Sequence, residues 1–205
     1  FGKDAQKYAE LSLLLQNVGD VTAEVANETL IAANAGFQLG GSYEALMGII
    51  DKFNHVSNLN ATNINKLSEA MKVGAATFHS AGLSIDETVA LIGTATASTQ
   101  RAGAEVSRAF RTILMNIRQI TDEEAEVTEE SMANAEKALN AIGIVVRDTP
   151  NTYRPMFDIL RDLGNAFENL TPVQQAFTAE SLANKRQADI LISTLQNWNT
   201  VEKQL

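Results

Sequence analysis

Residues 70–120 read AMKVGAATFHSAGLSIDETVALIGTATASTQRAGAEVSRAFRTILMNIRQI, and this stretch decides the fold of the chain. It is rich in Ala, Gly, Ser and Thr, and turn-like segments at 81–84 and 99–103 divide it into three helical runs. Small side chains let neighbouring helices approach closely. We therefore expect antiparallel helices that pack tightly and are joined by short connections.

The third of these helices, over about 102–120, has two distinct faces. At about 100° per residue, one side carries four arginines, Arg101, Arg108, Arg111 and Arg118. The opposite side carries apolar residues, namely Val106, Ala109, Phe110, Ile113, Leu114 and Ile117. The pattern predicts a buried apolar face and an exposed cationic face.

Helix signals continue in both directions along the chain. The pairs Ser84 with Glu87 and Thr121 with Glu124 have the spacing of a capping box. Ser42 and the Thr171-Pro172 step are also good helix starts. Pro155 suits the first turn of a further helix, in which apolar residues recur at helical spacing, namely Met156, Ile159, Leu160, Leu163 and Phe167. A last helix is predicted over 185–198, with Ile190, Leu191, Leu195 and Trp198 buried.

One segment has strand chemistry. Residues 144–146 are Ile-Val-Val, residues 148–151 are turn formers, and 152–154 could return as a second strand. The predicted fold class is therefore mainly α, a multi-helix bundle of about eight to ten helices with one short β-ribbon near 144–154. The acidic segment at 121–128 is the best internal boundary. It suggests a helical core at 1–120 and a helical subdomain with the ribbon at 121–205, or else one continuous domain.

Composition excludes several classes of function. The 205 residues carry a net charge of −9, which disfavours non-specific binding to nucleic acid or an anionic membrane. The chain has no cysteine, so it has neither a disulfide framework nor a thiolate metal site. Its uncharged stretches are shorter than a bilayer requires. The chain begins at Phe1 and ends in helix-like sequence, and we read it as a fragment of a longer protein.

Enzyme signals are weak. The phosphate-binding, zinc-protease and serine-hydrolase motifs are absent from the sequence. His55 and His79 have no paired ligand pattern, and the acids at 122–130 lack the glycine and spacing of a calcium loop. We therefore expect no catalytic residue, no cofactor, no metal site and no small-molecule substrate.

The arginine face has two interpretations. Arg101, Arg108, Arg111 and Arg118 could contact an acidic partner surface or a nucleic-acid backbone. Alternatively, they could pair with the acids at 122–130 of the same chain or be solvated. The negative net charge favours the second interpretation.

Four ordered segments resemble the core region of phage tail tape measure proteins. They are 43–60, 81–88 together with 102–114, 141–157, and 159–198. The most specific part is AGLSIDET at 81–88 followed by AGAEVSRAFRTIL at 102–114. Glu105 departs from the small residue that such proteins often carry there, which puts only local packing in question.

The resemblance implies a structural module, not an enzyme, of a phage or prophage tail protein. Its expected roles are tail assembly, tail length determination and DNA ejection. Its expected partners are other tape measure copies and the tail tube, tail-tip and tail chaperone proteins, with no sequence-specific nucleic acid and no membrane span. Its expected location is the virion tail, and the host cytoplasm during assembly. A cell-wall hydrolase module of a tail protein and a generic helical adaptor are the alternatives.

The two-faced helix generates a prediction about stability. Phe110→Asp should lower the free energy of unfolding by several kcal/mol, because it buries a charge without a partner. Arg111→Ala should lower it by less than about 1 kcal/mol, because it removes an exposed charge. Urea unfolding of both variants measures the difference. Equal unfolding midpoints would show that Phe110 and Arg111 do not lie on the buried and exposed faces assigned to them.

Overall fold

The computed structural model describes residues 5–120, 124 and 126–205. These residues form eleven α-helices and one two-stranded antiparallel ribbon, which confirms the predicted fold class. The helices are α1 (Ala5–Gly19), α2 (Ala23–Gly36), α3 (Tyr43–Leu59), α4 (Ile64–Ser80), α5 (Ile85–Thr99), α6 (Gly103–Arg118), α7 (Glu129–Ala141), α8 (Met156–Phe167), α9 (Pro172–Ala183), α10 (Ala188–Gln196) and α11 (Trp198–Lys203). The strands are β1 (Arg147–Thr149) and β2 (Thr152–Tyr153).

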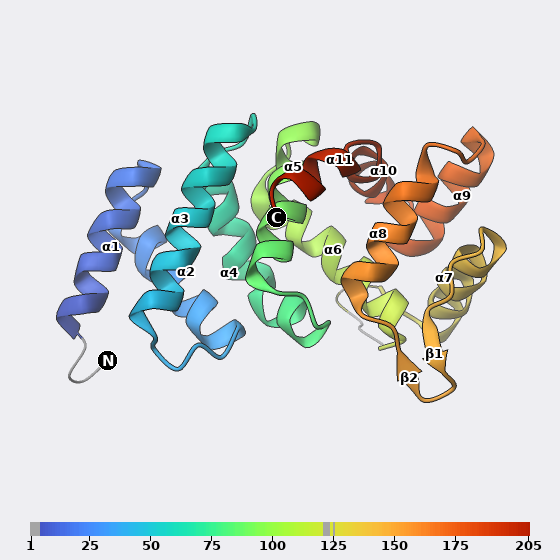
Figure 1. Cartoon of the computed structure of the whole chain (residues 1–205), viewed down its shortest axis with the longest axis horizontal. Helices are drawn as coiled ribbons and strands as arrows, with labels where there is room; N and C mark the ends of the chain where they lie inside the picture. The colour runs from blue at the N-terminus through green and yellow to red at the C-terminus, as the bar shows by residue number, and fades with distance from the viewer. Residues whose placement is uncertain (1–4, 121–123, 125) are drawn as a thin grey trace.

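The helices build an elongated array of two layers (Figure 1). Helices α1, α3 and α5 pack side by side in one layer, and α2, α4 and α6 do so in the other. Beyond α6 the second layer continues with α9 and α7, while α10 and α11 pack on α5 and also contact α8. The chain thus runs from one end of the array to the other and then returns, so that its last helix lies beside α5 (Figure 1).

Small residues set the spacing within the second layer. A Cβ atom at Gly103 would overlap the backbone carbonyl oxygen of Lys66, so α6 begins directly against the backbone of α4. One turn later, Ser107 Oγ donates a hydrogen bond of 2.9 Å to the carbonyl oxygen of Ala70. On the other side of α4, a Cβ at Gly36 would lie 2.5 Å from the Cβ of Ala75. The tight packing expected from residues 70–120 is therefore present, and it extends to α2.

Several helix starts follow the predicted capping chemistry. The Ser84 amide donates to Glu87 Oε2 at 2.7 Å, and the Glu87 amide donates to Ser84 Oγ at 3.2 Å, which completes the capping box of α5. Ser42 caps α3, and Thr171 caps α9. The box predicted for Thr121 and Glu124 lies outside the described residues, because Thr121 is not among them.

The position predicted for the first strand was wrong. Residues 144–146 are not a strand, and the pairing starts at Arg147, opposite Tyr153. The reason is burial: the side chains of Ile144 and Val146 are only 5% and 2% exposed and belong to the apolar core. The β-branched residues therefore anchor the connection that follows α7, and the ribbon projects beyond them.

The last predicted helix was also wrong in extent. Residues 185–187 form a connection, and the helical segment is divided into α10 and α11 at Asn197. Asn197 Nδ2 donates to the carbonyl oxygen of Ser193 at 2.8 Å, a local bond that competes with helix continuation. The predicted burial of Ile190, Leu191, Leu195 and Trp198 is confirmed.

The returning C-terminal segment closes the array. Gln204 Nε2 donates to Thr94 Oγ1 of α5 at 3.0 Å and to Asn60 Oδ1 after α3 at 3.3 Å. The Trp198 ring covers Gly164 of α8, where a Cβ would overlap the indole. Buried apolar side chains from Leu11 to Val201 belong to one cluster. The apolar core thus includes residues on both sides of the boundary predicted near 121–128.

The glycine contacts generate a matched pair of substitutions. Gly103→Ala should lower the free energy of unfolding by about 1–3 kcal/mol, because the new methyl group meets backbone atoms that cannot move aside. Gly48→Ala in α3 should instead be neutral or stabilising by roughly 0.5–1 kcal/mol, because nothing lies within 4 Å of its Cβ position. Thermal or urea unfolding tests the pair, and a Gly103→Ala variant as stable as Gly48→Ala would contradict the close helix contact.

Candidate partner-binding surface

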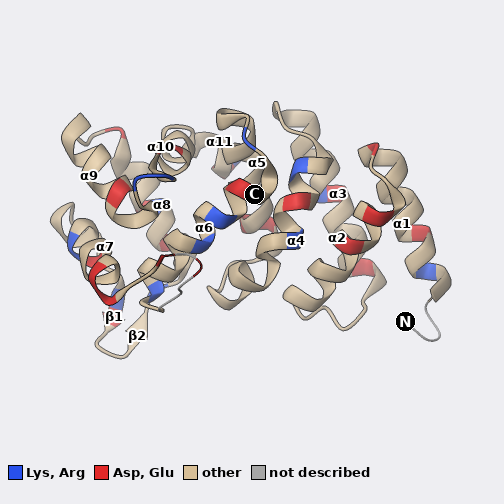
Figure 2. Cartoon of the chain, turned by 180° about the vertical axis from the view of Figure 1, so that it is seen from behind, with Lys and Arg blue, Asp and Glu red and all other residues tan. Residues whose placement is uncertain are grey.

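The sequence predicts that α6 has a buried apolar face and an exposed cationic face. Its apolar residues Val106, Ala109, Phe110, Ile113, Leu114 and Ile117 are at most 1% exposed, which confirms the helix phase. Seen from behind, the ribbon of α6 contains basic positions, and the connection between α9 and α10, which also contains basic positions, lies next to it (Figure 2). The four arginines nevertheless have quite different surroundings.

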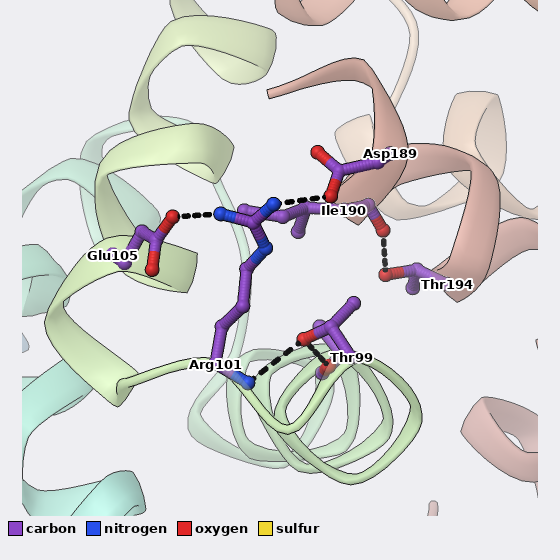
Figure 3. A network of polar contacts seen from close by, with 7 residues as sticks. Thr99, Arg101, Glu105, Asp189, Ile190 and Thr194 are labelled. Atoms are coloured by element: carbon purple, nitrogen blue, oxygen red, sulfur yellow. Dashed lines mark hydrogen bonds and ion pairs between the residues drawn. The ribbon is translucent and has the colours of Figure 1, made fainter. Parts of the chain in front are cut away.

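Arg101 is held between two carboxylates (Figure 3). Its guanidinium hydrogen-bonds Glu105, and its Nη2 donates to Asp189 Oδ2 at 2.5 Å. These two bonds, that to Glu105 first, raise the pKa of Arg101 above its ordinary value. Because Asp189 lies in the first turn of α10, Arg101 fastens the start of α6 to the start of α10. We assign it a structural role in the isolated chain.

Arg118 is engaged at the other end of α6. Its Nη2 donates to the carbonyl oxygen of Ala81 at 2.5 Å, and its guanidinium lies 5.5 Å from the centre of the Tyr153 ring. Arg147 lies over the same ring at 4.7 Å. Burial lowers the pKa of Arg118 from its ordinary value. Arg118 therefore ties the ribbon and the α4–α5 turn to the end of α6.

Arg108 and Arg111 differ from both, because they line a pocket of about 260 Å³. Its lining residues are Val73, Arg108, Arg111, Thr112, Glu124, Glu126, Asn184, Arg186 and Gln187. We call it the arginine pocket. Arg111 Nη1 pairs with Glu124 Oε2 at 2.9 Å, and Arg186 Nη1 lies 3.8 Å from Glu126 Oε1. Within the described part of the chain, the exposed guanidinium of Arg108 has no ion pair or hydrogen bond.

The α9–α10 connection forms one wall of the arginine pocket. Asn116 Nδ2, buried on α6, donates to the carbonyl oxygen of Leu182 at 2.9 Å and so fixes the last turn of α9. Asn184 then takes a left-handed backbone, with φ 60° and ψ 161°, and turns the chain into α10. Ser131 of α7 donates to Asn116 Oδ1 at 2.8 Å, so three helices share this buried polar bridge.

Sequence reasoning missed Asn184, Arg186 and Gln187. It placed 185–187 inside a helix, and that assignment hid a connection beside the arginines of α6. The signal was available as Asn-Lys-Arg-Gln between two apolar helical runs, a polar cluster typical of a loop. The spacing along the chain alone cannot show that this loop faces Arg108.

The two histidines lie apart from this surface. His55 is exposed on α3, and His79 packs edge-on against the Phe37 ring with centroids 5.6 Å apart. No group of three or more acidic or histidine side chains is arranged to hold a metal ion in the described ranges. Within these ranges, no helix has both the length and the apolar character needed to cross a bilayer.

Comparison with known proteins gives two matches. The model of the family described as phage-related minor tail protein matches residues 2–183. The probable tape measure protein of Escherichia phage P2 is 27% identical over 157 residues, which cover 76% of this chain. The same match covers 18% of that relative, so the chain spans less than a fifth of its length. No solved structure matches.

The contrast between the arginines generates a prediction. Arg118→Ala should lower the free energy of unfolding by about 1–2 kcal/mol, because it removes a part-buried, charge-assisted hydrogen bond and a cation–π contact. Arg108→Ala on the same helix should leave stability nearly unchanged. Urea unfolding of the two variants measures this difference. If Arg108→Ala lowered the free energy of unfolding as much as Arg118→Ala, the contacts assigned to Arg118 would not account for its contribution to stability.

Proposed function

Because the chain belongs to the family of phage-related minor tail proteins, we propose that it is a folded structural module of a tail tape measure protein. The match over residues 2–183 carries this proposal, and the similarity to the P2 protein supports it. The module acts in tail assembly and contributes to tail length determination and to DNA ejection. It resides in the virion tail, and in the host cytoplasm while tails assemble.

The way the chain folds supports a role in assembly rather than in measuring. A continuous helix would rise about 1.5 Å per residue, so 205 residues in one rod would span about 300 Å. Here the chain is divided among eleven described helices and returns on itself, so its ends are much closer than that (Figure 1). We propose that the long helical parts of a tape measure protein set the length, and that this module makes contacts.

The proposed partners are other tail components. They are further tape measure copies and the tail tube, tail-tip and tail chaperone proteins. The outer side of α6 with the α9–α10 connection is the proposed contact surface, because it gathers exposed charged groups in one place (Figure 2). Arg108 is its proposed contact residue, since Arg101, Arg111 and Arg118 are engaged within the fold.

A pair of deletions tests this function. Removing residues 1–205 in frame from the parent protein should abolish or cripple tail formation. Removing an equal number of residues from a long uninterrupted helical stretch of the parent should give tails that are shorter but otherwise normal. Electron microscopy of the particles reports both outcomes. Intact tails shortened by about 300 Å after the first deletion would show that the segment is a simple ruler.

A further inference from the structure

The last two helices of the chain form an arm that packs against the rest of the fold. We define the arm as residues 188–205, which comprise α10 and α11, and the body as the described residues before 184. Helix α10 packs on α5, α6, α8 and α9, and α11 packs on α5 and α8 (Figure 1). The arm buries five apolar side chains that are each at most 4% exposed, namely Ile190, Leu191, Leu195, Trp198 and Val201. Arm and body therefore have complementary surfaces.

Polar contacts fix the position of the arm on the body. At the start of the arm, Asp189 Oδ2 accepts a hydrogen bond of 2.5 Å from Arg101 Nη2 (Figure 3). Near its end, Gln204 Nε2 donates to Thr94 Oγ1 at 3.0 Å. These contacts join positions 88 and 110 residues apart. Neither contact requires that arm and body belong to the same chain, and only the connection at 184–187 imposes this.

The connection is strained at its first residue. Asn184 has φ 60° and ψ 161°, a combination that is essentially reserved for glycine. Gln100 and Gln119 also have positive φ, but their ψ values of 14° and 48° place them in the left-handed helical region. The backbone of Asn184 therefore costs free energy that an extended connection would recover.

A second cost arises at the other end of the connection. The side-chain oxygen of Gln187 is buried and accepts no hydrogen bond within the described part of the chain. A buried acceptor without a donor costs free energy. If the connection opened, water could reach this oxygen and donate to it. Both ends of the connection thus favour an open form, whereas the apolar surface of the arm favours docking.

A second copy of the chain satisfies both demands. When two copies exchange their arms, the contacts between arm and body are all made again, and only the connections change conformation. Short connections under strain favour such an exchange. Four extended residues span roughly 13 Å, so the two copies meet near the ends of their α9 helices.

From these observations we infer that two copies of this chain form a dimer by exchanging residues 188–205. The arm of each copy occupies the groove that α5 and α8 of the other copy provide. This inference rests on the proposed function in one respect, because further tape measure copies are among the proposed partners. It names the segment through which two such copies join.

Refolding at several protein concentrations tests the dimer. The whole chain is refolded from urea, and size-exclusion chromatography with light scattering measures the dimer fraction, which should rise with concentration. Asn184→Gly should raise the concentration needed for half dimer roughly tenfold, because glycine relieves the strain in both closed monomers. Asn151→Gly makes the same change in the turn of the ribbon, where φ is not positive, and should have no effect.

Cross-linking shows whether the arms are exchanged. The chain has no cysteine, so single cysteines can be introduced. Gln204 Nε2 donates to Asn60 Oδ1 at 3.3 Å, so the exposed residues that follow them, Leu205 and Ala61, lie near each other. Chains with Ala61→Cys and chains with Leu205→Cys are mixed in urea, refolded together and treated with a short bis-maleimide. An exchanged dimer should give a covalent product of two chains linked between positions 61 and 205.

Two controls accompany these measurements. The same two cysteine variants, refolded separately and mixed only afterwards, should give no link between positions 61 and 205. Asn184→Gly should unfold thermally at or above the midpoint of the wild-type chain, so that its lower dimer fraction is not a loss of folding.

Three results would overturn the inference. They are a chain that stays monomeric at every refolding concentration, a dimer that gives no link between positions 61 and 205, and equal dimer fractions for Asn184→Gly and Asn151→Gly. None of these results bears on the deletion experiment, so the tail function can stand while the inference about the arm fails.

Discussion

The direct contact of α6 with the backbone of α4 is the constraint on which the rest of the array depends. Gly103 meets the carbonyl oxygen of Lys66, and Ser107 bonds the carbonyl oxygen of Ala70, so the two helices are fixed in both spacing and register. With α6 held in this way, its apolar face is buried. Helices α7 and α9 then pack on α6, and α10 joins them through Arg101.

Those parts of the fold that depend on local chemistry could be predicted from the sequence. The capping box at Ser84 and the apolar stripe from Met156 to Phe167 each act within a few residues, and both were placed correctly. The prediction of a strand at 144–146 was wrong because β-branched residues suit a strand and a buried connection equally well. The break at Asn197 was not predicted, because the apolar spacing of the helix continues to Trp198 although one side-chain amide ends the helix at Asn197.

The candidate surface could be predicted only in part, for a physical reason. Helical periodicity places Arg101, Arg108, Arg111 and Arg118 on one side of α6, but it does not say which tertiary partners they meet. Asp189 lies 88 positions from Arg101, and Tyr153 comes from a ribbon whose first strand was predicted at the wrong residues. The arginine pocket needs α9 to end beside α6, which is fixed by the buried amide of Asn116. Such contacts arise only after the helices have packed.

The return of the chain to the middle of the array has a mechanical consequence. If tension were applied between residues 5 and 205, it would load α1 and α11 together, and α11 would leave α5 by breaking a few contacts at a time, beginning with those of Gln204. Helices α10 and α9 would follow. The glycine-packed contacts of α2, α4 and α6 would come under tension later, and they would be sheared along their length. The same fold is therefore weak to peeling from its two ends and stronger where α2, α4 and α6 pack, so the force needed to extend it would rise from step to step.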